Sequence, residues 1–227
     1  MSHLNQNSVT KAMIYKDWYF NKAHILLFGL IGLVAAFMLS FESVIFYVGQ
    51  ALLISMVIII GALLVFSTVV NERKKQTLAF LMSLPITCMD YTKAKLIFNL
   101  SVYFVAWSIL TVATLGIIMY STHIPNGLIP YSLIILLELM IAFILVLGTA
   151  LVSESEIWSI VVMTITNIGV SVFMFMIAFI KDIGRHMDGT IPVWNKTALT
   201  IITIEIVVGI AIIVLTLYLQ SRKKDFI

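Results

Sequence analysis

Charge and cysteine are both scarce in this sequence. Only 11% of its 227 residues are Asp, Glu, Lys or Arg, whereas a soluble domain usually contains about one quarter. The single cysteine, Cys88, excludes an internal disulfide and a metal site built from several cysteines. The four histidines lie in unrelated segments, which argues against a zinc site within the chain. Most of the protein surface must therefore face something other than water.

The sequence also lacks the motifs of several enzyme classes. It contains no G-x-x-x-x-G-K-[ST] loop, so it cannot hold ATP phosphates by that route. It contains no G-x-S-x-G motif and no Asp in the middle of an apolar segment. A membrane-embedded transferase or protease is therefore the least favoured alternative. The net charge of +3 comes from clustered basic residues and does not indicate a nucleic-acid partner.

Long apolar segments dominate what is present. Hydrophobic residues make up 61% of the chain, and its mean hydropathy is +1.10. A membrane-spanning helix needs roughly 20 mostly apolar residues. Spans are predicted at residues 23–39, 44–70, 96–120, 129–152, 157–180 and 197–219. The fold class is thus an all-α polytopic membrane protein with one transmembrane domain, residues 1–227, and both termini on one side.

Residues 1–22 form a different kind of segment, polar with an apolar stripe. Val9, Met13 and Phe20 fall near one side at helical spacing, whereas Thr10 and Asp17 mark the opposite side. This pattern predicts an amphipathic helix that lies in the membrane interface.

The basic residues are distributed unevenly between the two sides of the predicted bundle. Eleven lie on the side of the termini: Lys11, Lys16, Lys22, Arg73, Lys74, Lys75, Lys93, Lys95, Arg222, Lys223 and Lys224. Three lie in the opposite loop, residues 181–196: Lys181, Arg185 and Lys196. The positive-inside rule then places both termini in the cytoplasm. We expect a multi-pass protein of a plasma membrane, most simply a bacterial one, with an extracellular loop at 181–196 and a cytoplasmic tail at 220–227.

Residues 71–95 form the longest charged segment that does not span the membrane. A short helix is predicted at 76–83, because Leu78, Leu81 and Met82 repeat at helical spacing. Pro85 ends it, and Thr87-x-x-Asp90 fits a capping box that begins the next helix. One interpretation is a basic loop that only fixes topology. The ordered series of charged pair, short helix and Ser-Leu-Pro turn favours a contact for a partner.

The motifs in this segment resemble those of a known transporter family. The order Asn71-Glu72-Arg73-x-x-x-Thr77-Leu78-x-x-Leu81-x-Ser83-Leu84-Pro85-Ile86, followed by Lys93 or Lys95, is similar to the coupling-helix region of type 2 ABC exporter permeases. Lys16-Asp17 before the first span and the basic tail ending in Lys-Asp-Phe also resemble small bacterial members. Six spans match the family layout, although the large extracellular domain of some relatives is missing, which puts lipoprotein- or toxin-linked mechanical roles in doubt.

The resemblance implies a transport subunit, not an enzyme. It implies a homo- or heterodimer with the transport path between protomers, and a separate ATPase subunit that binds ATP and Mg²⁺. This chain would bind no cofactor itself, and its only other contacts would be membrane lipid. The substrate would be hydrophobic or amphipathic, with peptides and antimicrobials as examples. The resemblance assigns ATPase coupling to ten residues: Glu72, Arg73, Lys74, Lys75, Thr77, Leu78, Phe80, Leu81, Ser83 and Pro85.

Two carboxylates lie inside predicted spans. Glu138 and Glu205 follow the outer starts of the fourth and sixth spans by similar numbers of residues. At 1.5 Å per residue, both are predicted roughly 12–14 Å below the outer surface. Ionisable residues at such depth indicate function by default, here a substrate path. The alternative is a protonated carboxyl group that hydrogen bonds to a neighbouring helix. For the whole chain, the alternative to an exporter is an accessory or sensor membrane protein without a transport path.

Overall fold

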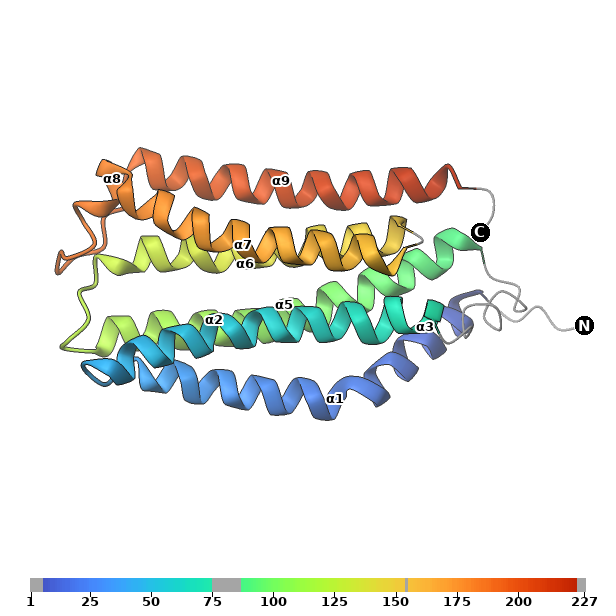
Figure 1. The fold of residues 1–227 in the computed structure, drawn as a ribbon, viewed down its shortest axis with the longest axis horizontal. Coiled ribbons are helices and arrows are strands. Elements are labelled where there is room, and N and C mark those ends of the chain that lie inside the picture. The colour runs from blue at the N-terminus through green and yellow to red at the C-terminus, as the bar shows by residue number, and fades with distance from the viewer. Residues whose placement is uncertain (1–5, 75–86, 154, 224–227) are drawn as a thin grey trace, which may run out of the picture.

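The computed structural model describes residues 6–74, 87–153 and 155–223. Within these residues the chain forms helices and turns and no β-strand, and the long helices lie side by side along one axis (Figure 1). The long helices are α1 (Gln6–Met38), α2 (Val44–Val65), α5 (Cys88–Tyr120), α6 (Leu128–Val152), α7 (Glu156–Phe179) and α9 (Lys196–Ser221). Three shorter elements are the π-helical turn η1 (Phe66–Val70), α3 (Asn71–Lys74) and α8 (Lys181–Gly184).

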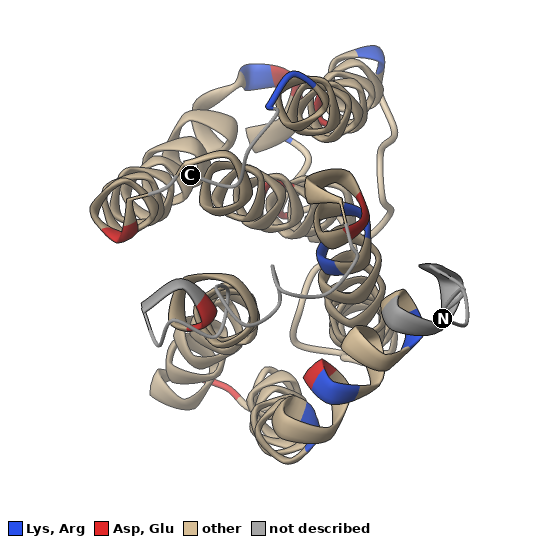
Figure 2. Ribbon diagram, turned by 90° about the vertical axis from the view of Figure 1, so that its right-hand side faces the viewer, with Lys and Arg blue, Asp and Glu red and all other residues tan. Residues whose placement is uncertain are grey.

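Six helices in the described part of the chain are long and apolar enough to cross a membrane, with α2 and η1 forming one continuous span. The fold-class prediction of an all-α polytopic membrane protein is confirmed. α1 begins and α9 ends at the same end of the bundle, on the right in Figure 1. Figure 2 looks onto this end and shows mostly uncharged ribbon, with acidic and basic residues at a few places.

The N-terminal helix differs from the prediction in one respect. The boundary expected between residues 22 and 23 is not a helix end, because α1 runs without a break from Gln6 to Met38. It bends instead, so that its N-terminal part runs obliquely to the bundle (Figure 1). The bend is not caused by a proline or glycine, because neither lies near Lys22. Inside the helix at this point, the Asn21 side chain donates a hydrogen bond to the Asp17 carbonyl. Placement of the first 22 residues in the membrane interface stays a prediction.

α6 occupies the centre of the bundle and contacts α2, α5, α7 and α9. α2 and α6 are the most buried spans, whereas α7 and α9 expose most of their apolar side chains. Lipid is as apolar as these side chains, so close packing and hydrogen bonds must hold membrane helices together. One such contact is the stack of the Tyr103 and Phe143 rings, whose centroids lie 3.8 Å apart. Gly61 makes room for it, since a Cβ there would lie 2.9 Å from the Phe143 ring.

The loops at the far end of the bundle are tied to one another. The Asn195 side chain caps α9 by accepting from the Ala198 amide at 2.8 Å, and the Thr197 hydroxyl donates to the Asp182 carboxylate at 2.7 Å. The Gly127 amide donates to the Gly189 carbonyl at 2.7 Å. The 181–196 loop is thus fastened both to α9 and to the turn before α6.

The predicted capping box at Thr87 is confirmed. The Thr87 hydroxyl accepts from the Asp90 amide at 3.1 Å, and the Asp90 carboxylate accepts from the Thr87 amide at 3.2 Å. α5 therefore begins where the sequence predicts. The predicted short helix at 76–83 and the turn at Pro85 lie outside the described residues.

Candidate functional site: a buried charge cluster

Four charged side chains meet at the end of the bundle where α1 begins. We call Lys16, Asp17, Glu72 and Lys95 the charge cluster. The Lys95 ammonium group lies 2.7 Å from one Asp17 oxygen and 2.8 Å from one Glu72 oxygen. Lys16 donates to the other Glu72 oxygen and lies 3.4 Å from Asp17. The cluster therefore joins α1, α3 and α5 through ionic hydrogen bonds.

Three of the four side chains of the charge cluster are buried, the Lys16 side chain is 34% exposed, and the four charges balance. Lys95 is 0% exposed, Asp17 3% and Glu72 7%. Two ammonium groups face two carboxylates, so the formal charges sum to zero. An isolated buried charge is very costly, whereas a paired and hydrogen-bonded one is tolerated. The positions of the three helices are therefore set by the requirement that each charge keeps its partner.

Several neutral groups complete the surroundings of the cluster. The Tyr91 hydroxyl donates to Glu72 at 3.1 Å, and the Lys95 ammonium lies 5.4 Å from the centroid of the Tyr91 ring. One turn further along α5, the Asn99 amide donates to the Lys95 carbonyl at 2.8 Å and to the Thr68 hydroxyl at 3.0 Å. These contacts hold the end of the second span against the start of the third.

The π-helical turn η1 determines where Glu72 lies. A π turn contains one more residue than an α turn, which rotates the residues that follow by about 100° around the helix axis. η1 ends where the Asn71 amide donates to the Phe66 carbonyl, and α3 with Glu72 follows at once. Wide turns of this kind occur frequently at functional sites. Here η1 sets the direction in which Glu72 leaves the second span.

A second set of contacts fastens the first turn of α5 to the opposite side of the bundle. The Cys88 sulfur donates to the Gln220 side chain at 3.5 Å, and Gln220 donates to the Leu151 carbonyl. The Lys223 ammonium donates to the Val152 carbonyl at 2.7 Å. The start of α5 is thus connected to the ends of both α6 and α9.

The predicted coupling residues fall into three groups. Glu72 lies in the charge cluster, whereas Arg73 and Lys74 are described only as backbone of α3. The others lie outside the described residues: Lys75, Thr77, Leu78, Phe80, Leu81, Ser83 and Pro85. The structure does describe the residues on both sides of this segment, and on both sides they are bonded to the bundle.

Sequence reasoning used Lys16, Asp17 and Lys95 for topology, for a helix face and as fragments of a motif but did not join them, and it missed Tyr91, Thr68 and Asn99. The signal that could have joined them is charge at the border of an apolar segment. Asp17 and Glu72 both lie close to a predicted span, at 23–39 and 44–70 respectively. Lys95 is the one basic residue directly before the third span.

The predicted carboxylate pair lies where α6 and α9 pack closely. A Cβ on Gly148 would lie 2.6 Å from the Thr216 hydroxyl, and one on Gly209 would lie 2.7 Å from the Ile141 side chain. This register places Glu205, one turn before Gly209, at the same level as Glu138, one turn before Ile141. The two carboxyl groups thus share one level along the bundle, and their depth in a membrane stays a prediction. A role in a substrate path stays a prediction.

Glu205 has an unusual environment for a buried carboxyl group. It is 5% exposed, and neither of its oxygens has a hydrogen-bond partner among the described residues. Glu138 is half-buried. Burial of a polar group without a partner costs about 1–3 kcal/mol. Glu205 therefore weakens the contact between α6 and α9.

Glu205→Met is expected to raise the free energy of unfolding by about 1 kcal/mol or more, because it removes that unpaired group. Gln220→Met is the matched control, since Gln220 is 4% exposed but its side chain donates one hydrogen bond and accepts another. It should lower the same quantity by about 1–3 kcal/mol. Thermal unfolding of the purified proteins in one mild detergent measures both. Destabilisation by Glu205→Met would show that the carboxyl group contributes to packing.

No group of three or more His, Cys, Asp or Glu within residues 6–74, 87–153 and 155–223 could hold a metal ion. The charge cluster, with its two ammonium groups, is likewise unsuited to a cation. Comparison of the chain with protein-family models, curated proteins and solved structures finds no match to any of them.

Proposed function

We propose that this chain is the membrane-spanning subunit of an ATP-driven type 2 ABC exporter. It would dimerise, as a homo- or heterodimer, and pair with separate ATPase subunits that bind ATP and Mg²⁺. The observation that carries this proposal is the charge cluster. It unites three fragments that resemble the permease pattern, namely Lys16-Asp17, Glu72 and Lys95, although they are far apart in the sequence.

The positions of these contacts suit a mechanical role. The segment 75–86 follows α3, which contains Glu72, and precedes Thr87 at the start of α5. Glu72 is held by Lys16, Lys95 and Tyr91, and the first turn of α5 is held by Gln220. A loop with loose ends would absorb a displacement by rearranging. A loop with fixed ends passes the displacement on to the second and third spans.

The partner contact itself is assigned from the sequence. Arg73, Lys74 and Lys75 would pair with acidic groups at the rim of an ATPase cleft, while Leu78, Phe80 and Leu81 occupy the cleft. Exposed ion pairs contribute only about 0–1 kcal/mol each. The apolar side chains therefore supply most of the binding free energy.

The remaining assignments follow from charge and composition. Eleven basic residues on the side of the termini against three on the other support cytoplasmic termini in a bacterial plasma membrane. The apolar bundle supports export of a hydrophobic or amphipathic substrate, such as a peptide or an antimicrobial. Glu138 and Glu205 would line the path of that substrate.

Leu81→Asp tests the coupling assignment. The tagged chain, solubilised mildly from its own host, should carry a stoichiometric ATPase subunit recognisable by its phosphate-binding loop. We expect Leu81→Asp to lose this subunit, because a carboxylate cannot enter an apolar cleft without a large desolvation cost, while Leu81→Met keeps it. Mass spectrometry of the eluates measures the ratio, and membrane fractionation confirms insertion of each variant.

Two outcomes would overturn the proposal. Recovery of the unmodified chain alone, reproducibly and after crosslinking through its loop lysines, would favour an accessory or sensor protein. Equal recovery of the ATPase with Leu81→Asp would place the contact elsewhere. A second permease in equal amount would instead identify the dimer as a heterodimer.

A further inference from the structure

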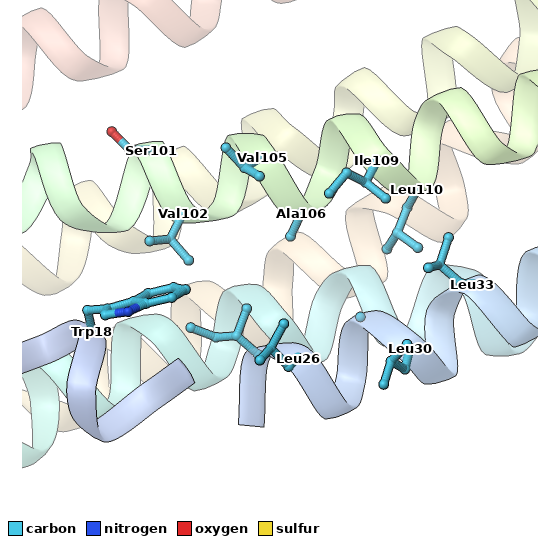
Figure 3. A pocket seen from close by; sticks show the side chains of 12 residues that line it. Trp18, Leu26, Leu30, Leu33, Ser101, Val102, Val105, Ala106, Ile109 and Leu110 are labelled. Atoms are coloured by element: carbon cyan, nitrogen blue, oxygen red, sulfur yellow. The ribbon is translucent and has the colours of Figure 1, made fainter. Parts of the chain in front are cut away.

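A long apolar groove separates α1 from α5. It has a volume of about 400 Å³ and is lined on one side by Trp18, Leu26, Gly29 and Leu33, and on the other by Val102 and Ile109. Figure 3 shows Trp18 at one end of the groove and Leu33 at the other, with Val102, Ala106 and Leu110 of α5 pointing toward α1 across the gap. Ser101 is the one hydroxyl among the lining side chains. The volume lies within the range of small-molecule sites, about 300–1,000 Å³.

The length of the groove matches one leaflet of a bilayer. Fifteen residues separate Trp18 from Leu33, which is about 22 Å along the axis of α1, its bend included, at 1.5 Å per residue. One leaflet with its headgroups measures about 20–22 Å, half of a bilayer 40–45 Å thick. The groove also opens outward, because Leu26, Leu30 and Val105 are more than half exposed. In a membrane-spanning chain, that opening faces lipid.

The Trp18 end of the groove carries positive charge. Lys11, Tyr15, Trp18 and Lys22 repeat at intervals of three and four residues, the spacing of one helix face, and the same spacing continues into the groove at Ile25 and Gly29. The side chains of the first four, from Lys11 to Lys22, are exposed. The Lys22 ammonium lies 4.9 Å from the centroid of the Tyr19 ring. Basic and aromatic residues followed by an apolar channel match, in order, the phosphate and hydrocarbon of a phospholipid.

We propose that the groove between α1 and α5 binds one acyl chain of a membrane phospholipid. The chain comes from the leaflet on the side of the N-terminus, and its phosphate lies beside Lys22. A second copy packed on the groove by two-fold symmetry fits less well, because the basic face of α1 would then lie against the same basic face of its partner. This assignment does not depend on ATP-driven transport.

The location of the groove gives the bound lipid a structural role. Trp18 follows Asp17 directly, and Val102 lies two turns after Lys95 on α5. The groove therefore begins where the charge cluster ends. A lipid chain in it fills the space between the same two helices that the Asp17–Lys95 pair holds together.

Gly29→Phe is designed to fill the groove without disturbing the helix. A Cβ at Gly29 meets no neighbouring atom of the described residues within 4 Å, and neither does one at Gly169 on α7. Gly169→Phe is therefore the matched control, with the same change in side chain and in helix propensity at an exposed position that does not line the groove. Equal thermal midpoints for the two variants confirm that both are folded.

The full chain, reconstituted in phosphatidylcholine and phosphatidylglycerol vesicles, is irradiated with a phospholipid that carries a photoactivatable group on one acyl chain. Mass spectrometry maps the adducts. We expect adducts on Leu26, Val102 and Ile109 in the unmodified protein and in Gly169→Phe. In Gly29→Phe they should fall about tenfold or more, because the ring occupies the site. Unchanged adducts in Gly29→Phe, or protein–protein crosslinks across the groove, would overturn the proposal.

A second arm tests the contact with phosphate. Diacylglycerol with the same photoactivatable chain lacks the phosphate and should give fewer adducts in the groove than the phospholipid. Lys22→Gln should remove this preference and leave labelling by diacylglycerol unchanged. Equal labelling by the two lipids in the unmodified protein would overturn the assignment of the phosphate to Lys22.

Discussion

Lys95→Met is expected to lower the free energy of unfolding by about 3–5 kcal/mol, the usual cost of removing one partner from a buried ion pair. The substitution keeps the length and apolar stem of the side chain and removes only its charge. Asp17 and Glu72 then remain buried together, 3% and 7% exposed, with Lys16 alone to balance them. Thermal unfolding in mild detergent, followed by the yield of monodisperse protein, measures the loss.

Lys93→Met is the control for that prediction. Lys93 lies two residues earlier on α5 and its side chain is exposed, so the same substitution there should change the stability by less than about 1 kcal/mol. Adding Asp17→Asn to Lys95→Met restores the balance of charge and should recover part of the loss. Equal effects of the Lys93 and Lys95 substitutions would contradict an ionic role for Lys95.

Gly127→Ala is expected to lower the free energy of unfolding by about 3 kcal/mol, the upper end of the usual cost of overpacking. A Cβ at Gly127 would lie 1.8 Å from the His186 carbonyl oxygen and 2.9 Å from the Gly189 carbonyl oxygen. Both are backbone atoms, so relief requires the 181–196 loop to move away. That movement would break the hydrogen bond from the Gly127 amide to Gly189.

Gly116→Ala makes the same chemical change with the opposite expected sign. Among the described residues nothing lies within 4 Å of a Cβ at Gly116, which sits inside α5. Alanine should therefore stabilise the helix there by up to about 1 kcal/mol. Thermal midpoints of the two variants, compared with the unmodified protein, test both signs. A harmless Gly127→Ala would show that the two loops do not approach so closely.

The helices could be predicted closely from the sequence because their signals are local. The span predicted at 44–70 coincides with α2 and η1, and the one at 129–152 begins one residue after α6 does. Length and hydropathy suffice for such segments, and the Thr87–Asp90 capping box depends on residues three apart. The expected break near Lys22 was not found, because whether an amphipathic helix continues into a span depends on what it packs against.

The charge cluster could not be predicted because its contacts are remote in sequence. Lys16 and Glu72 are 56 residues apart, and Asp17 and Lys95 are 78 apart. The orientation of Glu72 also depends on η1, and nothing in Phe66–Val70 distinguishes a π turn from an α turn. Cys88, noted in the sequence only as a lone thiol, donates a hydrogen bond to Gln220, which lies 132 residues further along the chain.

The order of the charge cluster along the chain bears on how the protein is made. Synthesis runs from the N-terminus, and earlier segments fold or insert first. Asp17 and Glu72, which precede Lys95 in the sequence, have therefore already left the ribosome when Lys95 emerges. Both carboxylates that pair with Lys95 are therefore available when its span is inserted. The third helix can thus enter the membrane with its lysine neutralised on arrival.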